Sequence, residues 1–275
     1  MATIMRPLED LAVRVRRSSL LRQANPLWRQ IRPVYQKFLG WYGKDGIERN
    51  INRTDRLYVV PELYTLSEDY ESDVWPVIMG EVHLGDVIAD VGANIGLYTI
   101  ALANRVGSRG RVLAFEPDEA NARVLRRHVS LNQVVTQTEV RVQAVGDREG
   151  FISFLTGQQS ESRVSLEANA EHPQVEVTTL DSVFQHQKVD ILKIDVEGFE
   201  AHVLRGAMSL LRDAARAPRV IFVEFHPHAG AKFGLTGESL LELLRSCAYQ
   251  IFDTAGRPID RISEYGEIVA RRIRS

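Results

Sequence analysis

Charged side chains with the chemistry to move a proton or bind a cation lie at and just after the ends of two apolar runs in the second half of the chain. They are Lys193, Asp195, Glu197, Glu224, His226 and His228. Side chains alternate along a strand, so Lys193, Asp195 and Glu197 share one face of the first run. Charges at the end of a buried strand are costly unless they face a wet cleft or one another. The pattern therefore indicates either a reaction centre or a lysine–carboxylate cluster that ties the strand to the next helix.

A ligand-binding turn is indicated earlier, where an apolar run ends in Asp90-Val-Gly-Ala-Asn-Ile-Gly96. Gly92 lets the chain turn without a Cβ, and Gly96 allows close packing where a helix begins. Asp90 can hold a ligand or order the loop, while Asn94 can adopt left-handed geometry or bond to the ligand. The alternative is a tight structural turn without a ligand.

Glu116 ends the next apolar run, 20 residues beyond Gly96. An acidic side chain at this place can accept hydrogen bonds from both hydroxyls of a ribose. The lack of a Gly-x-Gly-x-x-Gly sequence argues against a nicotinamide dinucleotide, whose pyrophosphate needs that close backbone approach. An adenosine-type ligand is therefore expected. Asp147, after the third run, either forms the adenine edge of this site or begins a turn.

A parallel sheet would bring these strand ends to one edge. Apolar runs predict strands at 87–91, 111–115, 140–145, 150–155, 174–179, 189–194, 219–225, 249–253 and 267–273. Helical spacing predicts helices at 96–106, 118–132, 199–211 and 236–248. The alternation predicts an α/β fold, with a roughly seven-stranded, mostly parallel sheet and helices on both faces. The last two strands are expected to form an antiparallel hairpin at one edge.

The chain is expected to have two regions: a basic helical arm or cap at 1–70 and the main domain at 71–275. Within the main domain, 150–180 is expected to be an inserted hairpin or flap, whose polar stretch 156–173 is either a substrate-side flap or a surface loop. Residues 1–40 carry eight basic and two acidic side chains, a net charge of +6. Such a segment either packs as a solvated helical arm on its own domain or a second subunit, or lies on a membrane surface.

The composition is that of an ordinary globular protein, with 44% hydrophobic and 25% charged residues. A formal net charge of −2 gives no overall attraction to nucleic acid. The single cysteine cannot form an internal disulfide, which favours a reducing compartment. No apolar run approaches the roughly 18–20 residues of a membrane span, and the first ten residues lack a secretory signal. We expect a cytoplasmic protein, with peripheral membrane association as the alternative.

The chain resembles the FkbM-type methyltransferase family in several motifs that occur in the same order. The matching segments are Gly85–Gly96, Val112–Pro117, Ala144–Asp147, Thr179–Asp181, Val189–Gly198 and Val223–Glu224. The resemblance implies a Rossmann-like class I methyltransferase fold with S-adenosylmethionine as cofactor. The expected cofactor-binding residues are Asp90, Gly92, Ala93, Asn94, Gly96, Glu116 and Asp147.

The resemblance also implies methylation of a hydroxyl oxygen on a sugar or another natural-product, glycan or small-molecule acceptor. An alcohol is a poor nucleophile until its proton begins to leave, so a base is expected beside it. The candidates are Glu197, Asp195 and His226, with Lys193 orienting a carboxylate or steadying negative charge on oxygen. Glu197 is the first choice, because it lies furthest into the expected cleft.

Three alternatives stay open. Mg²⁺ held by Asp195, Glu197 and Glu224 would lower the pKa of the acceptor hydroxyl directly. Clustered carboxylates alone do not define a metal site, so a bound metal is not favoured. An NAD-linked oxidoreductase is supported only by Glu116. A catalytically silent, methyltransferase-like partner subunit would dock through residues 1–40.

Overall fold

The computed structural model describes residues 46–63, 65–155, 163–165, 173–231 and 236–273. The chain divides into two compact units, Met1–Glu68 and Asp69–Ser275, and each is described by itself. The basic segment 1–40 and most of the polar stretch 156–173 lie outside the described residues, so their roles as an arm and a flap stay predictions. Within the described ranges, no helix has both the length and the apolar character needed to cross a membrane.

The described part of the first unit is a β-hairpin, not the helical arm expected over 1–70. Strand β1 (Ile47–Ile51) pairs antiparallel with β2 (Asp55–Val59), and a 3-10 helix, η2 (Pro61–Leu63), follows. Asn52 and Arg53 both have positive φ in the turn, and Thr54 N donates to Ile51 O at 3.0 Å. Every second residue of each strand is buried, which is the period of a strand and explains why this segment is not helical.

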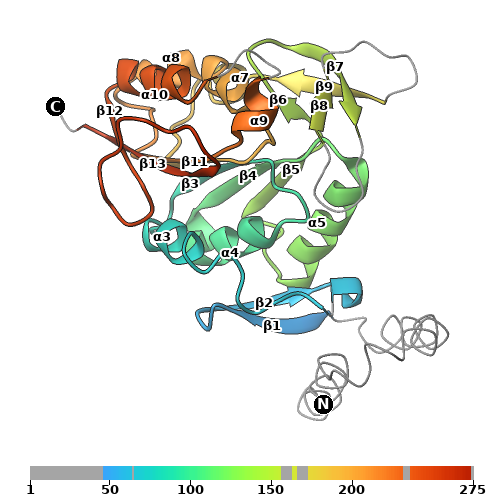
Figure 1. The fold of residues 1–275 in the computed structure, drawn as a ribbon. Helices are drawn as coiled ribbons and strands as arrows, with labels where there is room; N and C mark the ends of the chain where they lie inside the picture. Colours follow the sequence, from blue (N-terminus) through green and yellow to red (C-terminus); the bar gives the residue numbers. More distant parts are fainter. Residues whose placement is uncertain (1–45, 64, 156–162, 166–172, 232–235, 274–275) are drawn as a thin grey trace, which may run out of the picture. The chain divides into compact units, whose positions relative to one another are not determined.

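A seven-stranded sheet forms the centre of the second unit (Figure 1). In spatial order its strands are β12 (Tyr249–Phe252), β13 (Gly266–Arg272), β11 (Val220–Phe225), β10 (Ile191–Ile194), β3 (Val87–Val91), β4 (Arg111–Phe115) and β5 (Thr138–Arg141). The five neighbouring strands β11, β10, β3, β4 and β5 are parallel to one another, while β13 pairs antiparallel with both β11 and β12. The predicted α/β sheet and its antiparallel edge hairpin are confirmed.

The parallel strands are apolar along most of their length because helices cover both faces of the sheet. One face carries α3 (Trp75–Gly80), α4 (Leu97–Val106) and α5 (Glu119–Leu131) (Figure 1). The other carries α7 (Glu200–Arg205), α8 (Met208–Arg212) and α10 (Gly237–Ser246). Because β3, β4, β10 and β11 are parallel, the loops that follow them meet at one edge of the sheet.

Capping side chains fix two helix starts. Asp118 accepts hydrogen bonds from Ala120 N and Asn121 N, so α5 begins directly after the loop that follows β4. Thr236 and Ser239 form a reciprocal capping box at the start of α10, with two N–H to hydroxyl bonds of 3.1 Å.

A second, four-stranded sheet changes one strand prediction. Its spatial order is β6 (Ala144–Val145), β9 (Gln174–Thr178), β7 (Gly150–Leu155) and β8 (Arg163–Ser165). The single strand expected at 140–145 is therefore divided between β5 and β6. Glu116 N still donates to Arg141 O at 3.0 Å. The chain then turns at Pro117 from β4 into α5, so the residues after Arg141 have no neighbouring strand in the described part of the central sheet. Residues 144–145 pair with β9 instead.

The single helix expected at 199–211 is also divided, into α7 and α8. Gly206 N still donates to His202 O, but Gly206 O accepts from Asp181 N at 2.8 Å. Asp181 also accepts from Ser209 N and Leu210 N at the start of α8, in the manner of a helix cap. This carboxylate lies far away in the sequence, so the break could not be inferred from helical spacing.

Candidate active site

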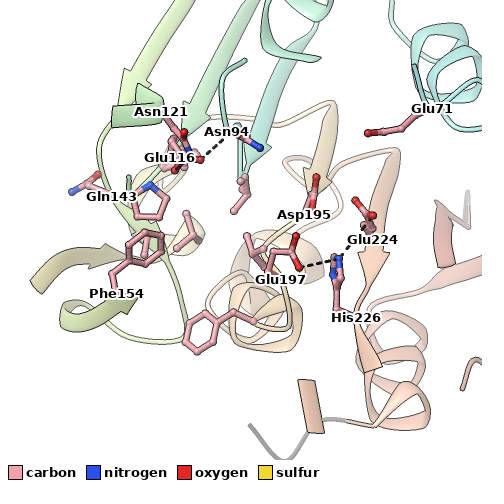
Figure 2. A pocket seen from close by; sticks show the side chains of 18 of the residues that line it. Glu71, Asn94, Glu116, Asn121, Gln143, Phe154, Asp195, Glu197, Glu224 and His226 are labelled. Carbon is pink, nitrogen blue, oxygen red and sulfur yellow. Dashed lines mark hydrogen bonds and ion pairs between the residues drawn. The ribbon is translucent and has the colours of Figure 1, made fainter. Parts of the chain in front are cut away.

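A cavity of about 540 Å³ opens beyond the carboxyl ends of β3, β4, β10 and β11. Open α/β sheets bind ligands at this position, and small-molecule sites usually measure roughly 300–1,000 Å³. Polar side chains gather on two sides of the cavity, one around Glu116 and one around Glu224 (Figure 2). The acidic lining residues are Glu71, Glu116, Asp195, Glu197 and Glu224. Neither lysine nor arginine lines it among the residues that the structure describes.

The loop after β3 has the geometry that its sequence predicted. Gly92 has a φ of 84°, and a Cβ there would lie 1.7 Å from Asp195 O, so only glycine allows the two strand ends to approach. Gly96 has a φ of 86°, and its Cβ would lie 2.0 Å from Leu125 Cδ1. Asn94 lines the cavity and adopts the expected left-handed geometry, with a φ of 50°.

Glu116 joins this loop to the loop after β4. Its carboxylate accepts from Asn94 N at 2.7 Å and from Asp118 N at 2.9 Å, and Asn121 Nδ2 lies at 3.5 Å. The residue is only 5% exposed but lines the cavity. Burial raises the pKa of Glu116 to about 7, although the N–H donors favour the charged form. The Glu116 carboxylate is therefore held in place at the cavity wall, and its contact with ribose hydroxyls stays a prediction.

Asp90 makes its contacts in the interior of the protein and does not line the cavity. It is fully buried, and its Oδ2 accepts from Thr99 Oγ1 at 2.6 Å. The other oxygen, Oδ1, has no hydrogen-bond partner among the described residues. Burial raises the pKa of Asp90, against the opposing effect of Lys193. Of the two roles considered for Asp90, the geometry supports the ordering of the loop; Ala93 and Gly96 likewise lie behind the cavity wall.

At Asp147 the geometry supports the second of the two roles considered from the sequence, the start of a turn. Asp147 lies outside the cavity wall, and its carboxylate is 2.8 Å from His202 Nδ1. The chain enters the second sheet at β6 and carries Asp147 past the cavity into the turn before β7. Gln143, two residues after β5, lines the cavity at this level instead.

Several lining residues were missed from the sequence. They are Asn121, Gln143, Phe154, Phe199 and Tyr265. Tyr70 and Glu71 also line the cavity. Asn121 carried a usable signal, because a polar residue in the first turn after a ligand-binding strand faces the same edge of the sheet. Phe154 comes from the second sheet, and Tyr265 from the segment before β13. Their positions depend on tertiary packing that no local pattern reveals.

Lys193 lies behind the cavity wall. Its side chain is 6% exposed, and its Nζ donates to Asp195 Oδ2 at 3.1 Å. The same Nζ lies 4.7 Å from the centre of the Tyr98 ring, a cation–π contact. Burial alone would lower the pKa of Lys193, but the carboxylates of Asp195, Asp90 and Glu267 raise it. Lys193 is thus a fixed charge that orients Asp195, the first of the two roles considered for it.

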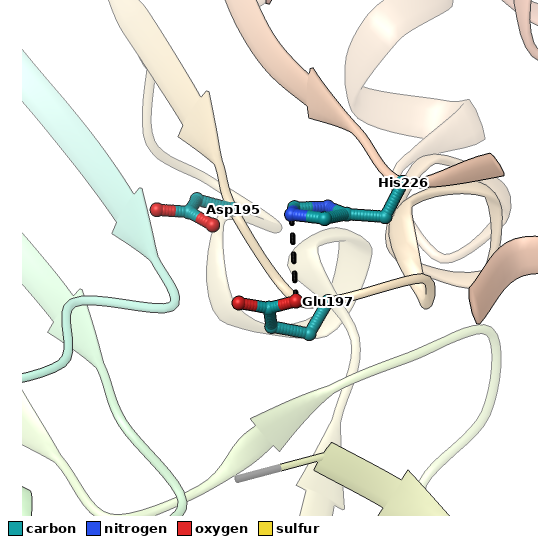
Figure 3. A group of neighbouring side chains, drawn as sticks. All are labelled: Asp195, Glu197 and His226. Atoms are coloured by element: carbon teal, nitrogen blue, oxygen red, sulfur yellow. Dashed lines mark ion pairs between the residues drawn. The ribbon is translucent and has the colours of Figure 1, made fainter. Parts of the chain in front are cut away.

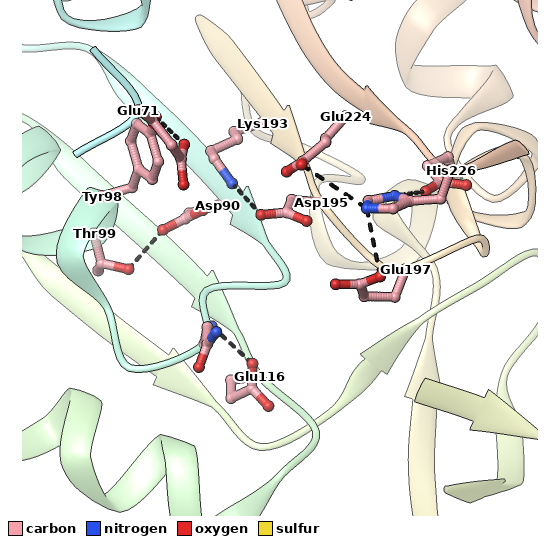
Figure 4. A network of polar contacts seen from close by, with 12 residues as sticks. Glu71, Asp90, Tyr98, Thr99, Glu116, Lys193, Asp195, Glu197, Glu224 and His226 are labelled. Carbon is pink, nitrogen blue, oxygen red and sulfur yellow. Dashed lines mark hydrogen bonds and ion pairs between the residues drawn. The ribbon is translucent and has the colours of Figure 1, made fainter. Parts of the chain in front are cut away.

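His226 is surrounded by carboxylates (Figure 4). Its Nδ1 lies 2.8 Å from Glu200 Oε1, and its Nε2 lies 3.4 Å from Glu197 Oε2 and 3.9 Å from Glu224 Oε1. Burial alone would lower the pKa of His226, but the bond to Glu200 and the nearby charges raise it to about 9. This raised pKa favours a proton on both ring nitrogens at neutral pH and opposes the role of free base considered for His226.

Three of the other carboxylates on the cavity wall, those of Asp195, Glu197 and Glu224, differ in access and charge. The side chain of Glu197 is 41% exposed, that of Asp195 28% and that of Glu224 19%. Burial would raise the pKa of Asp195, but Lys193 lowers it. Burial and the charge of Asp195 raise the pKa of Glu224 to about 7, while Tyr265 donates a hydrogen bond to it. Glu197 is therefore the most accessible of these three carboxylates.

A potential metal-binding group overlaps the one considered from the sequence. Asp195, Glu197 and His226 each offer one ligand atom, and these atoms lie within 4.8 Å of one another (Figure 3). In this group His226 takes the place considered for Glu224 from the sequence. Glu224 remains beside the group.

Comparison with known proteins gives a family match. A model of the methyltransferase FkbM domain matches residues 90–251. The AMB antimetabolite synthetase AmbE of Pseudomonas aeruginosa is 29% identical over 74% of this chain, and the match covers 11% of AmbE. The chain therefore spans about a tenth of the length of this curated relative.

Two solved structures illustrate the structural matches. A SAM-dependent O-methyltransferase from Thermotoga maritima has a TM-score of 0.44 and 16% identity, with 74% of this chain and 66% of that chain covered. A precorrin-6y C5,15-methyltransferase from Geobacter metallireducens has a TM-score of 0.43 and 13% identity, with coverages of 74% and 88%.

Proposed function

Because the chain belongs to the FkbM methyltransferase family, we propose that it methylates a hydroxyl oxygen of a sugar or another natural-product or small-molecule acceptor. The family resemblance seen in the sequence is confirmed, and the methyl donor is S-adenosylmethionine. Membership of a methyltransferase family also favours this function over an NAD-linked oxidoreductase. The choice of oxygen as the acceptor atom is our proposal.

The residues around Glu116 fit the nucleoside part of the donor. The Glu116 carboxylate lines the cavity and can accept hydrogen bonds from the ribose hydroxyls, while Asn121 and Gln143 offer amide groups nearby. The ring of Phe154 offers an apolar face on the same side of the cavity (Figure 2). The acidic lining also favours a positively charged sulfonium, because opposite charges attract strongly where water is partly excluded.

The observation that carries the proposal is the group of Asp195, Glu197 and Glu224 on the other side of the cavity (Figure 2). A neutral hydroxyl becomes nucleophilic only as its proton leaves, and carboxylates can accept that proton. Lys193 holds Asp195 from behind, and His226 holds Glu197, so the group is fixed before an acceptor binds. Orientation of this kind lowers the barrier of a reaction between two bound molecules.

S-adenosylmethionine supplies an electrophilic methyl group when bound. The acceptor oxygen forms a bond to the methyl carbon as the carbon–sulfur bond breaks, and the electron pair of that bond stays on sulfur. The hydroxyl proton passes to the carboxylate group. Glu197 is expected to have the largest effect, because its carboxylate is the most accessible of the three.

Donor binding and methyl transfer can be tested separately. S-adenosylhomocysteine should raise the melting midpoint of the protein, whereas NADH should leave it unchanged. The protein is then incubated with methyl-labelled S-adenosylmethionine and fractionated cell extract, and labelled products are fragmented by mass spectrometry. We expect the label on an oxygen of a small molecule or glycan.

Two variants complete this experiment. Glu197→Gln should reduce labelling by roughly 100-fold or more, the size of a lost activating group. Glu149→Gln, which changes an exposed acid outside the cavity, should label normally. Label on nitrogen or carbon, or full activity in Glu197→Gln, would contradict the proposal.

A further inference from the structure

We infer that Asp195, Glu197 and His226 form a binding site for a divalent transition-metal ion of the Mn²⁺ type. Their ligand atoms lie within 4.8 Å of one another (Figure 3), and the pair His226 Nε2 and Glu197 Oε2 is 3.4 Å apart. Ligands about 2.1 Å from a shared ion lie roughly 3–4 Å from each other. Small side-chain rotations therefore suffice to enclose an ion.

A buried carboxylate supports this assignment from behind. Glu200 is fully buried, and its Oε1 accepts from Gly198 N at 2.9 Å and lies 2.8 Å from His226 Nδ1. Metal-binding histidines usually donate their second ring N–H to a carboxylate, which fixes the ring and makes the free nitrogen more basic. Glu200 does not line the cavity, so it is a positioning residue that acts through His226.

The negative charge of the cavity wall also favours a bound cation. Five carboxylates line the cavity, and His226 is the one basic side chain among its described lining residues. Lys193 neutralises Asp195 only from behind, at 3.1 Å. Glu197 and Glu224 both face the Nε2 side of His226 (Figure 4). The local excess of negative charge would be offset by an ion at this place.

The ligand types select the class of metal. Carboxylate oxygens suit Mg²⁺, Ca²⁺ and Mn²⁺, whereas an imidazole nitrogen favours transition metals. Two carboxylates with one imidazole combine both preferences, and three protein ligands leave coordination positions open. Mn²⁺ is therefore a suitable probe for the site.

The consequence for chemistry rests on the proposed function. An acceptor hydroxyl in an open coordination position would lose its proton more easily, because the ion stabilises the alkoxide. The proton would pass to Glu224, whose Oε1 is 3.9 Å from His226 Nε2. The oxygen would then take the methyl group from sulfur, as described above. A proton on His226 Nε2 would compete with the ion, because it takes the nitrogen lone pair that would bind the metal.

A binding experiment decides between the ion and the proton. The full chain is treated with a chelator and titrated with Mn²⁺ alone, and the free ion is followed by electron paramagnetic resonance. We expect saturable binding of about one Mn²⁺ per chain. Glu197→Gln and His226→Gln should weaken binding at least tenfold, and Glu200→Gln by roughly 10–100-fold.

Matched measurements separate this inference from the proposed function. His202→Gln changes another histidine whose Nδ1 faces a carboxylate, and it should bind Mn²⁺ normally because His202 lies outside the cavity wall. Binding of S-adenosylhomocysteine is measured for every variant. A protein that binds S-adenosylhomocysteine but shows no saturable Mn²⁺ binding, or equal binding in Glu197→Gln and His226→Gln, overturns the metal site and leaves methyl transfer standing. Failure to bind S-adenosylhomocysteine would instead count against the proposed function.

Discussion

Protonation of Glu116 should control how tightly the protein binds S-adenosylhomocysteine. Burial raises the pKa of this carboxyl from 4.5 to about 7, so the free protein carries a proton there in mildly acidic solution. Ribose hydroxyls are better held by the charged carboxylate, and binding below the pKa must therefore expel the proton. At pH 6 only about a tenth of the groups are ionised, which costs about 1.4 kcal/mol. We expect the dissociation constant to be about tenfold higher at pH 6 than at pH 8.

The assay is isothermal titration calorimetry with S-adenosylhomocysteine across this pH range. Glu116→Gln should bind more weakly, by roughly 1.5–3 kcal/mol for a lost bond to a charged group, and its affinity should not change with pH. Glu224 is the matched control, because its pKa is also raised to about 7 but it lies on the other side of the cavity. Glu224→Gln should keep the pH dependence. Equal affinity of the unmodified protein at pH 6 and pH 8, or a pH dependence that survives Glu116→Gln, would refute the reasoning.

Two further predictions concern stability, measured as the free energy of unfolding in urea. Gly92→Ala should cost more than about 2 kcal/mol and abolish S-adenosylhomocysteine binding, because the new Cβ would lie 1.7 Å from Asp195 O. Gly85→Ala is the control, because φ is 88° at Gly85 but no heavy atom lies within 4 Å of the added Cβ. Only the backbone cost of about 1–2 kcal/mol should appear there. Equal losses of stability in the two variants would contradict the steric explanation. Arg219→Ala should cost roughly 2–3 kcal/mol, because both Asp86 oxygens lie within 3.0 Å of its guanidinium. Arg257→Ala is the control, because Arg257 is exposed and paired with Asp253, and it should cost under about 1 kcal/mol. A comparable loss of stability in Arg219→Ala and Arg257→Ala would show that burial of the ion pair does not determine its contribution.

The side of the cavity around Glu116 could be predicted from sequence because its geometric requirements are local. Gly92, Asn94 and Gly96 are fixed by the backbone geometry of one turn, and each has the positive φ that its residue type allows. Glu116 follows from the end of the next strand. The strands themselves were recognisable as apolar runs, since both faces of the sheet are covered.

The rest depended on contacts between distant segments. The run at 140–145 changes sheets because β4 ends at Phe115, and the helix at 199–211 divides because Asp181 caps its second half. The protonation of His226 depends on Glu200, which the sequence placed only in the first turn of a helix. A strand pattern shows which way a side chain points, but it does not show which charges it will meet.

The cavity wall has two origins within the chain. Glu116, Asp195, Glu197 and Glu224 all lie inside the segment that the family shares, 90–251, whereas Tyr70, Glu71 and Tyr265 lie outside it. Under the proposed function, the shared segment would supply the reaction, and the flanks would complete the surface that an acceptor meets. Exchanging residues 69–74 and 254–265 between members of the family is therefore a rational route to chimeras that keep the donor and change the acceptor.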